Sequence, residues 1–574
     1  MKMTGAQILC ESLVREGVEV IFGFPGGAVL PLYDTLPQYP QLRHILVRHE
    51  QGAAHAADGY ARVTGKVGVC LATSGPGAAN LVTGIANACL DSVPIVAITG
   101  QVARPFIGKD AFQEIDITGI TLPITKHNYL VLDVGLIAKI VKEAFYLART
   151  GRPGPVLIDI PRDVFIDQAE FHYPSRVDLP SYKPIIKGHP AQINKAAKLI
   201  NEAQRPLIIA GRGIIISGAY AELKQLAETA QIPVVTTLLG ISSFPESHVL
   251  SYGMLGMHGM AYANMAVDAA DAIIAIGMRF DDRATAKVSG FAPHAKITHI
   301  DIDPAEIGKN VRVDVPIVGD VKHVLRELNK LITSTEHIDW VRQLDDWRKE
   351  HPSVVIRDCA ELLPQFVIHK IYEVTKGEAI IVTGVGQNQM WAAQHYWYNK
   401  PNSFISSGGL GTMGFELPAA LGVKVGRPEE IVWCIAGDGG LQMTIQELAT
   451  IAQEKVAVKI AIIDNGYLGM VRQWQELFYQ KRYVATPLPC PDFVKIGEAY
   501  GIPALRVKNK AEVVPAIEKA MEYQGPFIID FMVEPEENVY PMVPPGASLA
   551  EVLEAPKKEA KALSDSVKLP VSNI

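Results

Sequence analysis

Gly437-Asp438-Gly439 follows the apolar run 431–436, and Asn465-Gly466-Tyr467 ends the next apolar run, 456–463. Between the two runs, residues 441–452 carry apolar side chains at helical spacing. The order of strand, tight turn, helix and strand predicts a βαβ crossover. Parallel strands of a doubly wound sheet bind ligands at their carboxyl ends, so both polar groups are expected at one binding edge.

The chemistry of these two tripeptides favours half of a magnesium–diphosphate site. Asp438, Asn465 and the backbone carbonyl of Tyr467 offer the hard oxygen atoms that Mg²⁺ prefers, and Mg²⁺ commonly shares its coordination with phosphates. Gly437 and Gly439 let the backbone approach a ligand closely. Either tripeptide alone is more often an ordinary turn. Their pairing across one crossover shifts the interpretation toward a metal site.

Length and composition set the class of protein. A chain of 574 residues is too long for one core and predicts about three domains. Apolar content of 48% with 20% charged residues is ordinary for globular proteins. The net charge of −7 without a basic stripe argues against nucleic acid as a partner.

The six cysteines include no Cys-x-x-Cys pair and are expected to be free thiols of a reducing cytosol. The amino terminus leads into an amphipathic helix pattern rather than a signal peptide. No apolar run approaches the roughly 18–20 residues needed to span a bilayer. We therefore expect a cytoplasmic protein without a membrane segment.

Strand-like and helical segments alternate along the chain in three blocks, which predicts an α/β protein with three doubly wound parallel-sheet domains. The expected domains are residues 1–172, 190–334 and 360–556, and residues 557–574 form a Lys- and Ala-rich tail expected to be mobile. A proline-rich linker separates the first two blocks, and a charged helical stretch precedes the third. The expected strands are 20–24, 44–47, 68–73, 95–99, 156–160, 206–210, 234–236, 272–276, 297–302, 380–383, 431–436, 456–463 and 527–532.

Block one holds two glycine-rich loops, Gly23-Phe24-Pro25-Gly26-Gly27 and Ser74-Gly75-Pro76-Gly77, each between a strand and a helix. Their backbone amides could hold an anion or a planar ligand, and turn chemistry alone explains them equally well. Between them, Arg48-His49-Glu50-Gln51 places a carboxylate at the start of an alanine-rich helix. In isolation, Glu50 is better explained as a favourable partner of the helix dipole.

The other blocks add further glycine and acidic motifs. Gly211-Arg212-Gly213 is a weak fragment of a dinucleotide fingerprint, and acidic residues at strand ends in block two suit ribose hydroxyls or an ordinary solvated surface. Block three contains Gly386-Gln387-Asn388 and a glycine loop, 408–414, that includes Met413. A methionine in such a loop is either a core plug or a prop beneath a ligand ring.

Taken together, Arg48-His49-Glu50-Gln51, the Asp438 and Asn465 tripeptides and Gly411-Thr412-Met413 resemble the thiamine-diphosphate-dependent enzymes. The sequence is most similar to the catalytic subunits of biosynthetic acetolactate synthase (acetohydroxyacid synthase), from about residue 4 to about residue 550. The discriminating motifs are Phe22-Gly23-Phe24-Pro25-Gly26-Gly27-Ala28, Asp110-Ala111-Phe112-Gln113-Glu114, Arg279-Phe280-Asp281-Asp282-Arg283 and Gln473-Trp474-Gln475. In that family the first block binds the aminopyrimidine, the middle block FAD, and the third diphosphate and Mg²⁺.

The resemblance implies that pyruvate is decarboxylated on thiamine diphosphate and joined to a second pyruvate or to 2-ketobutyrate, while FAD has no redox role. The implied metal ligands are Asp438, Asn465 and Tyr467. The implied catalytic residues are Glu50, Phe112, Gln113, Arg162, Arg279, Met413 and Trp474. The implied residues at thiamine diphosphate are Glu50, Gly386, Gln387, Asn388, Gly411, Met413, Gly437, Gly439, Gly440, Leu468, Gly469 and Met470. Toward FAD they are Arg152, Gly211, Arg212, Gly213, Thr237, Leu238, Met257, His258, Gly277, Arg279, Asp281, Arg283, Asp301, Ile302, Asp320 and Val321.

Four residues depart from the family pattern: Asn388 replaces a histidine, Asp464 an asparagine, Arg162 a lysine and Glu416 a glycine. The alternatives are another thiamine enzyme of the same fold, such as an oxidase, decarboxylase or carboligase, and a non-catalytic nucleotide-binding protein. The last leaves Glu50 and Met413 without a role. The resemblance further implies a homodimer or dimer of dimers with a small regulatory subunit.

Overall fold

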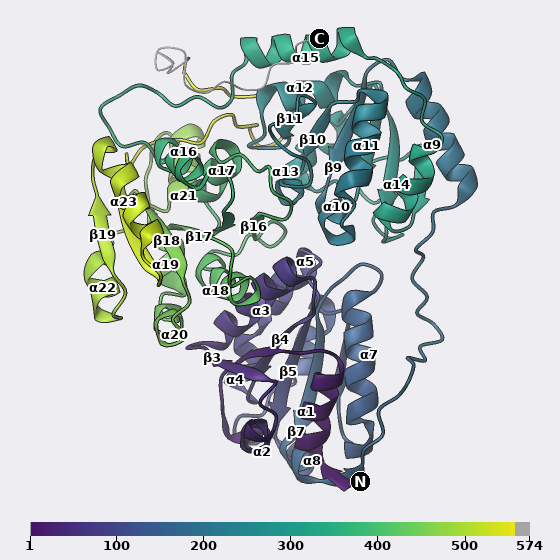
Figure 1. The fold of residues 1–574 in the computed structure, drawn as a ribbon, viewed down its shortest axis with the longest axis vertical. Helices are drawn as coiled ribbons and strands as arrows, with labels where there is room; N and C mark the ends of the chain where they lie inside the picture. Colours follow the sequence, from purple (N-terminus) through teal and green to yellow (C-terminus); the bar gives the residue numbers. More distant parts are fainter. Residues whose placement is uncertain (1, 557–574) are drawn as a thin grey trace.

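The computed structural model of the protein describes residues 2–556 and contains three six-stranded parallel sheets with helices packed against them (Figure 1). The expected fold class is therefore confirmed. The tail expected at 557–574 lies outside the described residues. A short antiparallel pair, β1 (Lys2–Thr4) with β8 (Gln168–Glu170), ties the start of the first domain to its end.

The amino-terminal domain has the strand order β3-β2-β4-β5-β7-β6. Its inner strands are fully buried apolar runs, as expected for a parallel sheet covered on both faces. The strands are β2 (Val20–Gly23), β3 (Arg43–Leu46), β4 (Gly68–Ala72), β5 (Ile95–Gln101), β6 (His127–Leu130) and β7 (Val156–Pro161). The main helices are α1 (Gly5–Arg15), α3 (Glu50–Thr64), α5 (Val82–Leu90) and α7 (Ile137–Arg149).

The middle domain has the strand order β11-β10-β9-β12-β13-β14. From β9 near the centre of the sheet, β10 and β11 follow on one side, and β12, β13 and β14 follow on the other. That is the strand order of dinucleotide-binding folds. The strands are β9 (Pro206–Ala210), β10 (Val234–Thr236), β11 (Ser251–Met254), β12 (Ala272–Ile276), β13 (Lys296–Asp301) and β14 (Val315–Val318). Its helices include α9 (Pro190–Glu202), α10 (Arg212–Ser217), α11 (Tyr220–Ala230) and α14 (Val321–Asn329).

The carboxyl-terminal domain has the order β16-β15-β17-β18-β20-β19, which repeats the topology of the amino-terminal domain strand for strand. No repeat is legible in the sequence, so the similarity lies in topology alone. The strands are β15 (Ile380–Thr383), β16 (Phe404–Ser406), β17 (Val432–Gly437), β18 (Val458–Asp464), β19 (Ala504–Val507) and β20 (Phe527–Met532). The strands β17 and β18 are parallel neighbours, so Asp438 and Asn465 follow adjacent strand ends as predicted.

The single helix expected over 441–452 was wrong. Two helices, α19 (Asp438–Met443) and α20 (Glu447–Gln453), form this crossover instead. They separate at Thr444, whose backbone leaves the helical region and whose Oγ1 donates a hydrogen bond to the Gly414 carbonyl at 2.8 Å. A side-chain hydrogen bond to a distant loop thus competes with helix continuation.

The amino- and carboxyl-terminal domains share one hydrophobic core. They meet where α3 crosses α18 (Glu416–Gly426), directly beneath the centre of the molecule in Figure 1. Glycine permits the close approach: a Cβ built on Gly59 would lie 2.2 Å from the Ala419 carbonyl oxygen, and one on Gly422 would lie 1.9 Å from that of Ala56. The relative position of the two domains is therefore fixed by backbone contact.

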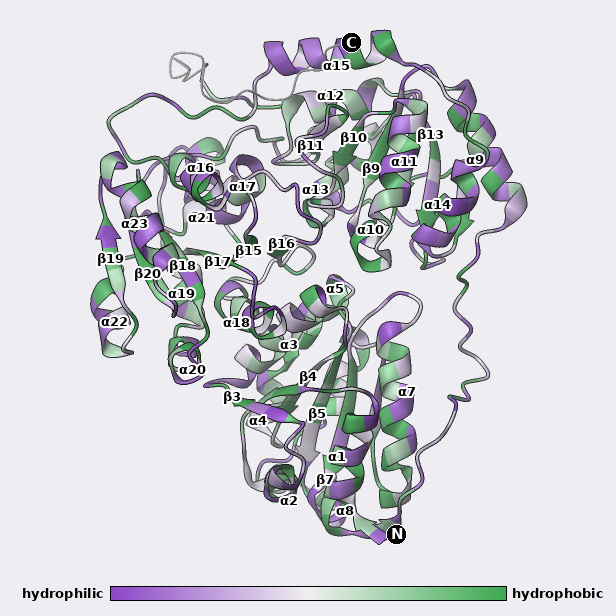
Figure 2. Ribbon diagram, in the orientation of Figure 1, coloured by the Kyte–Doolittle hydropathy of each residue, from purple (hydrophilic) through white to green (hydrophobic). Residues whose placement is uncertain are grey.

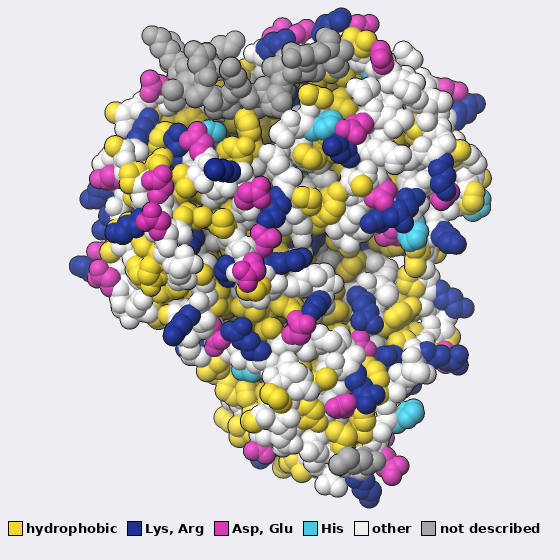
Figure 3. All heavy atoms as spheres, in the orientation of Figure 1, with side chains coloured by type: hydrophobic (Ala, Val, Ile, Leu, Met, Phe, Trp, Pro, Cys, Tyr) yellow, Lys and Arg dark blue, Asp and Glu magenta, His cyan; other side chains and the backbone are white. Residues whose placement is uncertain are grey.

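The surface matches the composition. In Figure 2 the strands are largely hydrophobic, and outer helices such as α15 (Ile338–Glu350) carry hydrophilic residues. On the face in Figure 3, basic and acidic side chains are interspersed. None of the helices within residues 2–556 combines the length and apolar character needed to cross a bilayer.

Candidate functional site

A cavity of about 1630 Å³ lies where the three domains meet. Its walls come from the strand ends and glycine loops of the carboxyl-terminal domain, from the middle domain, and from the turn after α5. Asp438, Asn465, Tyr467 and Met413 all line it. The cavity therefore joins the predicted metal residues to the predicted FAD residues.

Asp438 is buried at the start of α19. Its Oδ1 accepts a hydrogen bond from Gly439 N at 2.8 Å, and its Oδ2 accepts from Gly466 N at 2.8 Å. Burial, followed by the charge of Asp464, raises the pKa of Asp438 to about 7. Two carboxylates this close disfavour ionisation without a cation, so the position suits a positive ligand.

The Asn465 side chain is oriented by Gln387, whose Oε1 accepts a hydrogen bond from Asn465 Nδ2 at 3.1 Å. This contact leaves Asn465 Oδ1 as the oxygen that faces the Tyr467 backbone, from whose N–H it accepts at 3.1 Å. Asn388 donates from Nδ2 to the Ile435 carbonyl at 2.9 Å. Asn388 therefore stabilises strand β17 as a hydrogen-bond donor.

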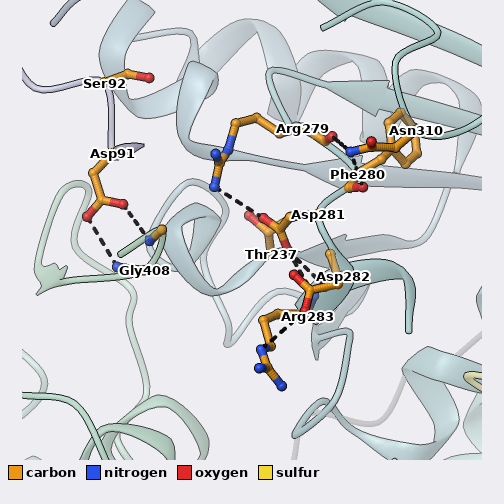
Figure 4. A network of polar contacts seen from close by, with 12 residues as sticks. Asp91, Ser92, Thr237, Arg279, Phe280, Asp281, Asp282, Arg283, Asn310 and Gly408 are labelled. Carbon is orange, nitrogen blue, oxygen red and sulfur yellow. Dashed lines mark hydrogen bonds and ion pairs between the residues drawn. The ribbon is translucent and has the colours of Figure 1, made fainter. Parts of the chain in front are cut away.

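The middle domain contributes the Arg279–Arg283 segment to the cavity (Figure 4). Arg279 Nη2 lies 3.5 Å from Asp281 Oδ2. Asp281 caps α13 (Asp282–Thr285) by accepting from the backbone N–H of Arg283 and Ala284, both at 3.1 Å. The helix cap fixes Asp281, and Asp281 in turn orients the Arg279 guanidinium.

Other residues predicted to bind FAD form ion pairs or have shifted pKa values. Arg152 binds Asp303 at 3.2 Å and Glu306 at 2.7 Å, so it links the first domain to the second. Burial raises the pKa of Asp301 to about 7 and lowers that of His258 to about 4. Within residues 2–556, His258 Nδ1 and Arg212 Nε are buried atoms without a hydrogen-bond partner. Both residues line the cavity, so their side chains form part of its polar wall.

Most of the predicted site residues line this one cavity. They are Arg152, Arg212, Gly213, Thr237, Leu238, Met257, His258, Gly277, Arg279, Asp281, Arg283, Asp301, Ile302, Asp320, Val321, Gly386, Gln387, Asn388, Gly411, Met413, Gly437, Asp438, Gly439, Gly440, Asn465, Tyr467, Leu468, Gly469, Met470 and Trp474. Glu50, Phe112, Gln113, Arg162 and Gly211 do not line it.

Four of the remaining residues lie around the carboxyl ends of the amino-terminal strands, among them Arg162, which directly follows β7 and begins α8 (Arg162–Ile166). Glu50 is buried, and its Oε2 accepts from Asn80 Nδ2 at 2.9 Å. A Cβ built on Gly75 would lie 2.8 Å from Gln113 Cα, so the glycine loop and the 108–114 loop touch. The Phe112 ring is 89% exposed. One chain therefore presents two separate half-sites.

Family models match each of the three domains. Models of the thiamine pyrophosphate enzymes match residues 3–120 (N-terminal TPP binding domain), 193–328 (central domain) and 384–531 (C-terminal TPP binding domain). The acetolactate synthase of Mycobacterium leprae is 54% identical over 564 residues, covering 96% of this chain and 90% of its own. The chain belongs to the acetolactate synthase family of thiamine pyrophosphate enzymes.

Two further relatives are named large subunits. The acetolactate synthase large subunit of Corynebacterium glutamicum is 52% identical over 96% of this chain and 90% of its own. The probable acetolactate synthase large subunit of Methanocaldococcus jannaschii is 50% identical over 97% of this chain and 96% of its own. The family resemblance is confirmed over nearly the full length, and its cofactor is thiamine diphosphate.

Sequence patterns missed several residues at the site. Cys490 was expected to be an inert buried thiol, but its Sγ donates to Asp438 Oδ2 at 3.3 Å. Glu447 is fully buried and accepts from the backbone N–H of Arg48 and of His49, each at 3.0 Å, beside Glu50. No short motif marks these residues, because each acts across a long sequence separation.

Glu416 is fully buried behind the cavity wall. A Cβ built on Gly384 would lie 2.4 Å from its carboxyl carbon, and one on Gly440 would lie 2.4 Å from its Oε1. Neither carboxyl oxygen has a hydrogen-bond partner among the described residues, although the backbone N–H groups of Gly414 and Glu416 lie near enough to lower its pKa somewhat. Burial dominates and raises that pKa to about 7.

Proposed function

We propose that this protein is an acetolactate synthase. It decarboxylates pyruvate and transfers the two-carbon unit to a second pyruvate, giving 2-acetolactate, or to 2-ketobutyrate, giving 2-aceto-2-hydroxybutyrate. This is the first common step of valine, leucine and isoleucine biosynthesis. The supporting observation is a cavity that joins Asp438, Asn465 and Met413 to the Arg279–Arg283 segment in a chain of this family.

Mg²⁺ and FAD are the further cofactors of the proposal. Asp438, Asn465 and the Tyr467 carbonyl supply the oxygen donors that Mg²⁺ needs, and the raised pKa of Asp438 fits a missing positive charge. The polar residues Arg212 and His258 in the cavity wall, together with the dinucleotide strand order of the middle domain, fit FAD. Thiamine diphosphate, when bound, supplies the electron sink for loss of carbon dioxide.

The protein positions the reacting groups. Glu50 would hold a proton at the aminopyrimidine ring nitrogen of the bound cofactor, and a positioned proton relay contributes roughly 10²–10⁴ in rate. Its contact with Asn80 fixes the carboxyl orientation. Met413 lies against the glycine turn after Asp438, 3.6 Å from a Cβ built on Gly439. There it would support the bound cofactor.

The acceptor is a second 2-ketoacid that keeps its carboxylate. The guanidinium of Arg279 suits that carboxylate geometrically. Trp474, in α21 (Gly469–Phe478), packs edge-on against Phe478 and faces the cavity, which suits a wall of the acceptor pocket. Phe112, Gln113 and Arg162 complete the site from the other half-site.

The active site is shared between two chains in this proposal. Glu50 and Asp438 must both reach one cofactor, but only Asp438 lines the cavity of its own chain. The exposed Phe112 ring fits burial by a partner subunit. We therefore infer a homodimer or a dimer of dimers. Relatives named as large subunits support a small regulatory subunit as well.

The cytoplasm is the proposed compartment. All six cysteines are free, as expected where thiols stay reduced. The decisive experiment measures carbon dioxide release and acetolactate formation from pyruvate, with and without thiamine diphosphate, Mg²⁺ and FAD. Acetolactate formation that requires thiamine diphosphate and Mg²⁺ supports the proposal. Acetaldehyde or acetyl phosphate as the product, or no turnover, contradicts it and points to another enzyme of this fold or to a non-catalytic protein.

A further inference from the structure

A buried charged cluster lies behind the glycine loop that leads to Met413. Arg62, in α3, has a fully buried side chain. Its Nε donates to Asp58 Oδ1 at 2.5 Å and its Nη2 to Asp91 Oδ2 at 2.8 Å. Its Nη1 donates to the Ser406 carbonyl of the carboxyl-terminal domain at 2.9 Å. One guanidinium therefore joins two helices of the first domain to the strand that begins the loop.

Asp91 holds the loop itself, as Figure 4 shows for Gly408. Its Oδ1 accepts from Gly409 N at 2.7 Å, and its Oδ2 accepts from Gly408 N at 3.1 Å. Nearby, Asn87 Oδ1 accepts from Ser407 Oγ at 2.6 Å and from Thr412 Oγ1 at 3.1 Å. The loop 406–412 thus takes much of its hydrogen bonding from side chains that precede it by more than three hundred residues.

The loop is also clamped sterically. A Cβ built on Gly408 would lie 2.5 Å from Leu239 Cγ of the middle domain. One on Gly409 would lie 2.8 Å from Leu90 Cβ and 2.9 Å from Asp91 Oδ1. Only glycine fits at both positions, and glycine gives the loop no stiffness of its own. Its conformation must come from the surroundings.

The cluster is balanced in charge between the first and middle domains. Arg62 and the buried Arg212 of the middle domain face Asp58 and Asp91. The Arg62 and Asp91 side chains are both fully buried, so neutralising one member would leave an uncompensated charge in a low-dielectric setting. The same change would weaken the acceptor for the partly buried backbone N–H groups of Gly408 and Gly409.

We propose that Asp91, supported by Arg62 and Asn87, is the positioning residue for the loop 408–413. Its side chain is fully buried, so it acts through this loop, which sets the position of Met413 in the cavity wall. The inference rests on the proposed thiamine-dependent function. It adds a requirement: the first domain of each chain shapes the cofactor wall of the third domain of the same chain.

The test compares Asp91→Asn with Arg43→Gln in the full-length protein. Arg43 also bridges the first and third domains, by a 2.8 Å pair with Glu454, but its side chain is 51% exposed and does not contact the loop. Amide hydrogen exchange of peptides covering 406–414 is measured without cofactor, and thiamine diphosphate affinity is measured by intrinsic fluorescence with Mg²⁺ present.

In Asp91→Asn we expect exchange in the loop to rise about tenfold and affinity to fall about tenfold, while exchange elsewhere stays as in the parent. Arg43→Gln should change neither. Unchanged loop exchange in a folded Asp91→Asn protein overturns the proposal.

If Asp91→Asn does not fold, the loop exchange of Ser407→Ala is measured instead. This substitution removes only the contact of Ser407 Oγ with Asn87 and the 2.9 Å hydrogen bond from Thr412 N. Faster loop exchange then supports the proposal, and unchanged exchange overturns it. Loop exchange needs no turnover, so acetolactate formation by the parent tests the proposed function separately.

Discussion

At the scale of single residues, Glu416 is one of the four residues expected to depart from the family pattern. Glu416 is buried, and its carboxyl oxygens have no hydrogen-bond partner among residues 2–556. Its pKa of about 7 exceeds the ordinary value of 4.5, so the folded protein retains a proton that the unfolded chain loses. The contribution of Glu416 to the free energy of unfolding is therefore greatest below pH 4.5. It declines by on the order of 3 kcal/mol as the pH rises toward 7.

Glu416→Gln should remove this decline, because the amide has the same shape and never ionises. Urea denaturation at pH 5.5 and pH 8 measures the free energy of unfolding of parent and variant. The parent should lose more stability between the two pH values than Glu416→Gln does. Glu518→Gln, at an exposed position, is the control and should match the parent. Equal pH dependence in parent and Glu416→Gln would show that Glu416 is ionised in the fold.

A second residue-scale prediction concerns Trp474. Trp474→Leu removes an aromatic wall of the acceptor pocket and leaves the donor chemistry in place. Pyruvate turnover should persist, while the preference for 2-ketobutyrate over pyruvate as acceptor falls, since one methylene in an apolar pocket is worth about 1–3 kcal/mol. The product ratio from mixed ketoacids is the measurement. An unchanged ratio would make Trp474 a packing residue.

At the scale of elements, what could be predicted depended on where each element lies. Central strands were legible because they are buried on both faces and appear as apolar runs. The seven missed strands, β1, β6, β8, β11, β14, β16 and β19, all lie at sheet edges, where a strand has one neighbour. The edge strands β6 and β19 are also only partly buried. The break at Thr444 depends on Gly414, and the loop 408–412 on Asp91, so neither is visible in a local pattern.

The crossing of α3 and α18 yields an element-scale prediction. Gly59→Ala should gain up to about 1 kcal/mol in helix propensity but place Cβ 2.2 Å from the Ala419 carbonyl, so overpacking should give a net loss of about 1–3 kcal/mol. Thermal denaturation checks this. Gly290→Ala is the matched control, because its Cβ would make only an ordinary 3.5 Å contact with Ser548. A Gly59→Ala protein as stable as the parent would mean that the helices separate easily.

At the scale of the whole molecule, the two half-sites of one chain do not line the same cavity. The predicted metal residues line the cavity between domains, whereas Glu50 and Gln113 lie at the strand ends of the first domain. Within one chain, Glu447 ties the Glu50 turn to the crossover that carries Asp438. Shared sites would make that contact a link between two different active sites of a dimer.

Complementation tests this arrangement. Glu50→Gln and Asp438→Ala should each abolish turnover, the first by removing the proton relay and the second by removing the charged metal ligand. Co-expression of the two variants with different affinity tags allows heterodimers to be isolated by tandem purification. Each heterodimer then combines an intact Glu50 from one chain with an intact Asp438 from the other at one site. We expect about half the parental activity per dimer, because one of two symmetric sites is restored. Heterodimers with no activity would mean that each chain builds its own site, and Glu50 would then need another role.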